Sequence, residues 1–215
     1  MEINKKAIQQ LADRIEKEND LFLLSTPKEQ KVIVAEDCLI RIQANQLIPY
    51  SGMFFNDSTV LRKIPQTIQS QLNTPEVGIQ CEGCAKGSLF LSYIGRTNKF
   101  NPCELKEGNS IEDPQHRKLL ELFTARELAY IEFAYEGAQF IEYDLLNEEI
   151  TFTEEEKFKA RMFYISYGGE HWGRVENDNF NPLFNDNNEH SSEENQERLI
   201  AICENIIAND GEFIL

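Results

Sequence analysis

Apolar residues recur at helical spacing along most of this chain, and several of these stretches begin with a capping box. The box is a Ser or Thr followed three residues later by Glu, and it occurs at Thr26/Glu29, Thr124/Glu127, Thr153/Glu156 and Ser191/Glu194. The hydroxyl accepts a backbone N–H of the first helical turn, and the Glu side chain accepts the N–H of the cap residue. Four boxes, each followed by helical periodicity, predict a mainly α protein.

The pattern predicts a compact multi-helix domain of about six to eight helices with at most a small β-hairpin. The expected helices begin after Asn4 and at Thr26, and the others cover 66–73, 77–98, 116–123, 124–137, 153–169 and 193–210. Residues 139–152 fit either a short helix or a strand, and the apolar tail 212–215 is expected to dock on the core. We expect one domain spanning 1–215, and the alternative is two lobes divided near residue 100.

Two of these helices are predicted to carry distinctive faces. In 77–98, small or apolar residues share one side, which would let another helix approach closely: Cys81, Cys84, Ala85, Ser88, Leu91 and Gly95. In 153–169, spacing predicts that Phe158, Met162 and Ile165 point inward.

Composition places the chain among globular proteins and constrains its partners. Its 215 residues are 41% hydrophobic, with no leader-like N-terminus and no apolar run approaching the roughly 20 residues of a membrane helix. Five cysteines, an odd number, in such a chain predict reduced thiols and a cytoplasmic protein. The net charge of −16 disfavours direct binding to nucleic acid or anionic membranes and favours a protein partner with a basic surface.

The negative charge is concentrated in the second half of the sequence. Residues 1–100 carry 12 Lys or Arg and 11 Asp or Glu, whereas residues 101–215 carry 9 and 26. One interpretation is a solvated surface, and the other is an interaction face, which could occupy the basic cleft of a nucleic-acid-binding protein. The candidate interaction residues are Glu121, Glu127, Glu132, Glu136, Glu142, Asp144, Glu148, Glu149, Glu154 and Glu155.

The pair Cys81-x-x-Cys84 is the one recognisable chemical motif. Two thiolates at this spacing hold zinc when two more ligands arrive, and the nearest candidates are Cys103 and His116. A redox function needs the pair at the start of a helix that follows a strand, and no such pattern is evident here. The favoured interpretation is that both cysteines are small apolar residues of the core, so no cofactor is expected.

Two further patterns are weaker. Asp186, Asn188, His190, Ser192 and Glu197 have calcium-loop spacing, but Ser191 stands where the loop needs Gly. Glu170-His171-Trp172 holds the single Trp beside two glycines, with no nucleophile nearby in sequence, so a structural role is favoured. Common nucleotide, zinc-protease and hydrolase signatures do not occur.

Three blocks of the chain resemble blocks in a group of uncharacterised small bacterial and phage-borne proteins. They are KVIVAEDCLIRIQANQLIPYSGMFF, CEGCAKGSLFLSYIG and RLIAICENIIANDGEF. The resemblance implies a compact, stand-alone cytosolic protein that mobile elements carry, and it transfers no catalytic residue.

The sequence therefore favours a non-enzymatic acidic protein that binds a basic or nucleic-acid-binding host protein through its C-terminal half, in the form of a phage-type inhibitor. The alternative is a small metal- or ligand-binding protein that uses Cys81 and Cys84. A third is an enzyme whose site is assembled from scattered residues, which spacing alone does not reveal.

Overall fold

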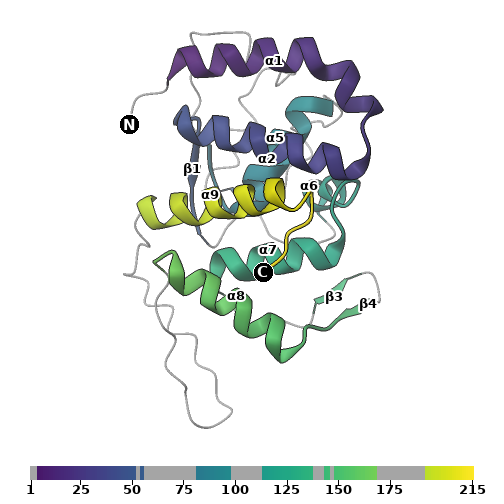
Figure 1. Ribbon diagram of the computed structural model, residues 1–215, viewed down its shortest axis with the longest axis vertical. Coiled ribbons are helices and arrows are strands. Elements are labelled where there is room, and N and C mark those ends of the chain that lie inside the picture. The colour runs from purple at the N-terminus through teal and green to yellow at the C-terminus, as the bar shows by residue number, and fades with distance from the viewer. Residues whose placement is uncertain are drawn as a thin grey trace.

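Seven helices and two pairs of short strands make up the part of the chain that the computed structural model describes (Figure 1). The described residues are 4–51, 54–55, 81–97, 113–137, 143–145, 148–168 and 192–215. The helices are α1 (Lys5–Leu24), α2 (Pro27–Gln43), α5 (Ala85–Thr97), α6 (Pro114–Leu119), α7 (Ala125–Glu136), α8 (Glu154–Ser166) and α9 (Ser192–Ala208). The strands are β1 (Leu47–Pro49), β2 (Cys81–Gly83), β3 (Tyr143–Leu145) and β4 (Glu148–Ile150). The predicted mainly α class is confirmed, and the helix expected at 66–73 lies outside the described residues.

Local capping positions the helices where the sequence predicted them. Capping boxes are formed at Thr26, Thr124 and Thr153, each closed by the Glu three residues later. The Asn4 side chain accepts the backbone N–H of Ala7 and so begins α1. Gly137 ends α7 in the left-handed conformation at φ 63°, which glycine adopts without a Cβ penalty. The fourth box begins at Ser191, outside the described residues.

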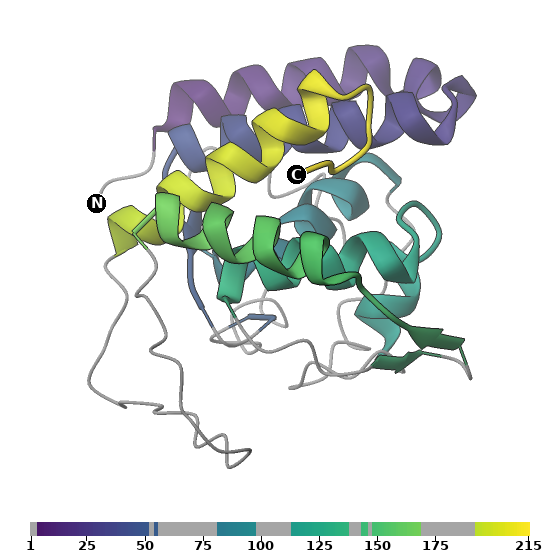
Figure 2. The same ribbon diagram turned by 60° about the horizontal axis from the view of Figure 1, so that its bottom comes forward.

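Helix α2 is the centre of the packing. It lies against α1, α5 and α9, while α7 packs against α5, α8 and α9. Figures 1 and 2 show the helices in layers, with α1 over α2 and α9, and with α7 and α8 below them. The core is apolar and continuous through these layers, and α9 contributes the side chains that the sequence predicted: Leu199, Ile202, Cys203 and Ile206.

The segment 77–98 is only partly helical, and the prediction was wrong for Cys81. Residues 81–83 form β2, which pairs in parallel with β1 in the register Leu47 to Cys81. The Cys81 N–H donates to the carbonyl of Gln46 at 2.9 Å, so a distant segment supplies the backbone hydrogen bond that a helix would have supplied locally. The helix begins at Ala85. The β1–β2 pair is a second small sheet, in addition to the β3–β4 hairpin.

The buried face of α8 also differs from the prediction. Phe158 and Met162 are 63% and 43% exposed and Ile165 is half-buried, whereas Ala160 and Tyr164 are buried. The guanidinium of Arg198 on α9 lies 4.2 Å from the centre of the Tyr164 ring and holds that face inward. The orientation of α8 is therefore set by a tertiary contact that its own spacing does not contain.

The C-terminal tail docks on the core, as predicted. The Phe213 ring contacts Tyr130 and Phe163, with ring centroids 5.7 and 6.0 Å away. Gly211 makes the turn into the tail at φ 90°, and a Cβ there would lie 2.3 Å from the Lys28 carbonyl oxygen. A side chain at position 211 would therefore force the tail away from α2.

Candidate functional site

The Cys81-x-x-Cys84 pair lies at the junction of β2 and α5, which is a strand-to-helix geometry that the sequence did not suggest. Cys81 is in β2, and Cys84 directly precedes α5. Both side chains are buried, and they face different surroundings. Arg41 is the charge that acts on Cys81, whereas Glu136, Lys86 and Glu132 act on Cys84. The two thiols therefore have no charged neighbour in common.

Burial makes both thiols poor nucleophiles and poor metal ligands. Loss of solvent raises the pKa of Cys81 to about 11 and the pKa of Cys84 to about 12. At neutral pH both stay protonated, and the thiolate is the form that attacks disulfides or binds zinc. Within the described residues, no three His, Cys, Asp or Glu side chains are grouped as a metal site. Of the other ligand candidates, His116 is buried with its ring 4.9 Å from the Phe54 ring, and Cys103 lies outside the described residues.

Four of the predicted acidic residues lie on or beside α7, and each is paired with another side chain of the molecule or is at least half-buried. Glu132 is buried and pairs with Lys86 at 2.6 Å. Glu127 closes the capping box of α7 and pairs with Lys31 at 2.5 Å. Glu121 accepts from Lys118 at 2.5 Å and from the Tyr93 hydroxyl at 3.2 Å, and Glu136 is half-buried at the end of α7. These carboxylates therefore add little free charge to a surface.

Glu154 and Glu155 are the most exposed of the predicted acidic residues whose side chains the structure describes. Their side chains are 89% and 76% exposed in the first turn of α8, and each lies beside a cation of the same helix: Lys157 at 2.8 Å and Lys159 at 3.0 Å. Asp144 belongs to β3, and Glu148 and Glu149 belong to β4. Glu142 lies outside the described residues. The structure thus spreads the predicted set over α7, α8 and the hairpin.

An acidic stripe that was not among the predicted interaction residues runs along α9. We define it as Glu193, Glu197 and Glu204, which are all exposed and fall on one side of the helix by their spacing. None of the three forms an ion pair with a described residue. The one cation of α9, Arg198, is buried and donates to the carbonyls of Tyr135 and Tyr167. The helical spacing of these acids was available in the sequence and could have identified the stripe.

Helix α8 has an exposed apolar side, and its C-terminal end lies close to the beginning of α9. The C-terminal end of α8 meets the beginning of α9, because a Cβ at Gly168 would lie 2.5 Å from the Glu194 side chain. Figure 2 shows the C-terminal end of α8 beside the beginning of α9, from which the two helices diverge. Phe158 and Met162 of α8 face away from the core. Large apolar side chains exposed on a helix face are typical of surfaces that contact other proteins.

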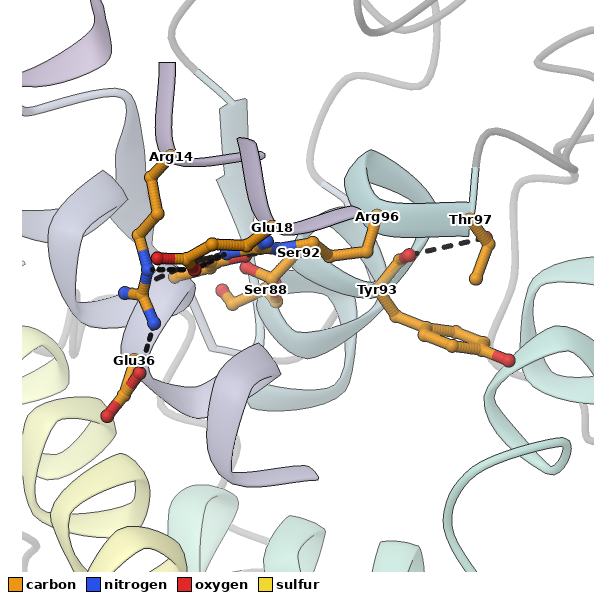
Figure 3. A network of polar contacts seen from close by, with 9 residues as sticks. Arg14, Glu18, Glu36, Ser88, Ser92, Tyr93, Arg96 and Thr97 are labelled. Atoms are coloured by element: carbon orange, nitrogen blue, oxygen red, sulfur yellow. Dashed lines mark hydrogen bonds and ion pairs between the residues drawn. The ribbon is translucent and has the colours of Figure 1, made fainter. Parts of the chain in front are cut away.

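A buried polar network lies between α1, α2 and α5 (Figure 3). Arg96 holds the carboxylate of Asp37 with two parallel hydrogen bonds, Nε to Oδ2 at 2.5 Å and Nη2 to Oδ1 at 2.8 Å, and both side chains are fully buried. Arg14 reaches the same carboxylate at 3.6 Å and also binds Glu18 and Glu36. Gly95, one of the small residues predicted to allow close approach of another helix, lies against α2, since a Cβ there would be 2.7 Å from Arg41 Nη2.

The remaining candidates lie largely outside the described residues. Of the predicted calcium-loop residues, the structure describes only the exposed Glu197 and the backbone of Ser192, and Glu170-His171-Trp172 is not described. Among the described residues, none of the helices combines the length and the apolar character that crossing a membrane requires. Comparison with family models, with curated proteins and with solved structures gives no match.

Proposed function

We propose that this chain is a non-enzymatic interaction protein that binds a partner protein with a basic surface through the acidic stripe of α9. The observation that carries the proposal is that Glu193, Glu197 and Glu204 are exposed without an ion pair to a described residue. Carboxylates that are not neutralised within their own molecule create a local negative potential, which steers and orients a basic partner.

The spacing of the stripe favours a protein with discrete cations over a surface built to receive duplex DNA. At about 1.5 Å of rise per residue, Glu193 and Glu204 are roughly 16 Å apart along the helix axis. A DNA duplex carries about one charge per 1.7 Å, so roughly ten charges occupy the same length. The three carboxylates therefore carry far fewer charges over this length than a DNA backbone does. They suit individual Lys or Arg side chains better.

The exposed side of α8 supports a macromolecular partner. Phe158 and Met162 supply exposed apolar area on α8, whose C-terminal end lies at the beginning of α9. Interfaces between proteins combine an apolar centre with charged residues at the rim. The specific form of the proposal is a phage-type inhibitor of a host protein whose surface presents individual Lys and Arg side chains.

The experiment compares two variants that lose the same charge. Glu193→Gln, Glu197→Gln and Glu204→Gln together remove the stripe, and Asp13→Asn, Glu16→Gln and Asp20→Asn remove three exposed acids of α1. Each protein is immobilised, proteins are captured from a bacterial lysate, and the affinity of the captured partner is measured at low and high salt. We expect the α9 variant to bind at least ten-fold more weakly and the α1 variant to bind like the wild type. Equal weakening of both, or binding that is insensitive to salt, would contradict the proposal.

A further inference from the structure

Arg41 has a buried guanidinium, two of whose nitrogens form no hydrogen bond to a described residue. The residue lies near the end of α2 and is only 1% exposed. Its Nη1 donates to Gln46 Oε1 at 2.6 Å. Its Nε and Nη2 are buried and form no hydrogen bond to any residue that the structure describes.

These two nitrogens are the edge with which arginine grips an anion. Nε–H and one Nη2–H point in the same direction, so together they hold two oxygens or one spherical anion. Arg96, one helix away, uses this same edge to hold both oxygens of Asp37. Arg41 thus presents the same Nε/Nη2 edge that Arg96 uses to bind Asp37, but no described residue accepts from it.

Among the residues that the structure describes, the carboxylate that acts most strongly on Arg41 already has another partner. Asp37, which acts on Arg41 over a longer distance, is already bound by Arg96 and approached by Arg14. Gln46 is neutral, and burial raises the pKa of Cys81 to about 11, so its thiol is uncharged at neutral pH. Arginine keeps its proton in proteins. A water molecule would complete the hydrogen bonds, whereas an anion would also neutralise the buried charge, which is the larger unfavourable contribution.

We propose that a chloride-sized anion binds the Nε/Nη2 edge of Arg41 where α2, α5 and β2 meet. The site is closed to solvent, and the backbone of α5 lies against the guanidinium, because a Cβ on Gly95 would be 2.7 Å from Nη2. This close approach favours a monatomic anion over phosphate or a carboxylate. The anion links α2 to the β2–α5 segment, which is distant from it in sequence, and so stabilises the folded state.

The test uses the full chain and bromide as the probe. Bromide replaces methanesulfonate at constant ionic strength, and the Tm is followed by circular dichroism. A ligand that binds only the folded state raises the Tm, and we expect a rise of about 3 °C or more for a chain of this size. In a crystal grown with bromide, we expect an anomalous peak within hydrogen-bond distance of Arg41 Nε and Nη2.

Three variants separate this site from a general salt effect. Arg41→Met removes the guanidinium and Gly95→Ala displaces it, so the Tm of both should no longer depend on bromide. Arg198→Met is the matched control, because Arg198 is equally buried but has both Nη atoms bonded to carbonyls. Its bromide response should persist. An equal Tm rise in wild type and Arg41→Met, or no anomalous peak at the Arg41 edge in wild-type crystals, overturns the proposal, and the crystal test does not depend on any variant folding.

Discussion

The α2–α5 interface and the outer side of α8 both contain ion pairs at hydrogen-bond distance, but in opposite environments. Arg96 and Asp37 meet at 2.5 Å with both side chains fully buried. Lys159 and Glu155 meet at 3.0 Å with both side chains largely exposed. In the interior, each charge depends on its partner because water is absent, whereas on α8 water solvates both charges whether or not they meet. An ion pair therefore stabilises the fold at the α2–α5 interface and contributes almost nothing to stability on α8.

This difference changes what the acidic composition means. Counted in the sequence, Asp37, Glu132 and Glu155 contribute equally to the net charge. In the structure, Asp37 and Glu132 are buried against Arg96 and Lys86, and neither is exposed to a partner. Only acids that are exposed and not paired can attract a basic surface at long range, and on α9 the acidic stripe meets that condition.

The largest effect is expected from breaking the buried pair. Asp37→Asn removes the buried, bidentate partner of Arg96 and leaves its guanidinium only the more distant and partly exposed carboxylate of Glu18, 3.8 Å away. We expect the free energy of unfolding to fall by about 3–5 kcal/mol. The measurement is denaturant unfolding at neutral pH. The neighbouring Glu36→Gln is the matched control, because Glu36 is partly exposed and, among the described residues, pairs with Arg14 alone. It should cost less than about 1 kcal/mol. Losses of similar size in the two variants would show that burial does not govern these pairs.

Alkaline pH tests the buried thiols of the β2–α5 junction. The folded-state pKa values of Cys81 and Cys84 are about 11 and 12, above the ordinary value of 9.0. Their contribution to stability is full below pH 9 and is lost as the pH rises toward 11–12, because the unfolded thiols ionise first. At about pH 10 each thiol should lower the free energy of unfolding by about 1.4 kcal/mol.

The measurement compares unfolding at about pH 7.5 and about pH 10. Cys81→Ala/Cys84→Ala should be less stable than the wild type at neutral pH but should lose less stability between the two values. Titration of lysines and tyrosines contributes to both proteins and cancels in the difference. Identical pH dependence in the two proteins would mean that the thiols are accessible to solvent in the folded state.

The helices could be predicted from sequence because their signals are local. Thr124 and Glu127 cap α7 through contacts within one turn, and the periodic apolar residues of α9 form its buried side. The strand at Cys81 could not be predicted, because its hydrogen bonds come from β1, a distant segment. The face of α8 was also misassigned, since Arg198 of another helix selects Tyr164 as the inward residue.

The buried polar interface between α2 and α5 could not be predicted either, because it also depends on contacts between segments distant in sequence. Asp37 and Arg41 are four residues apart on α2, which in a sequence is typical of an exposed ion pair. Only the approach of α5, with Gly95 against Arg41 and Arg96 against Asp37, places both inside. The acidic stripe of α9, by contrast, could have been read from helical spacing, because it needs only the helix and its buried side to be known.

The capping box of α8 should matter less than the buried Arg96–Asp37 pair and more than the exposed Lys159–Glu155 pair. Its hydrogen bonds are exposed, but they stabilise the first turn of the helix. Thr153→Ala removes the hydroxyl that accepts the Glu156 N–H at the start of α8. We expect the free energy of unfolding to fall by about 1 kcal/mol, measured by denaturant unfolding. Thr151→Ala, at an exposed position before the box, should change stability by less than about 0.5 kcal/mol. If Thr151→Ala were as damaging as Thr153→Ala, the box would not be the cause.

The smallest effect is expected from the exposed pair Lys159–Glu155 of α8. A double-mutant cycle with Glu155→Gln and Lys159→Gln isolates the interaction between these two side chains from their separate effects on α8. We expect a coupling free energy of about 0.3–0.5 kcal/mol at low salt. It should disappear in about 1 M salt, where the screening length is near 3 Å. A coupling above about 1 kcal/mol that persists in high salt would mean that Lys159 holds Glu155 as firmly as an interior pair. A weak, screened coupling instead leaves Glu155 free to exchange Lys159 for a cation of another protein, so that part of the acidity of α8 joins that of α9.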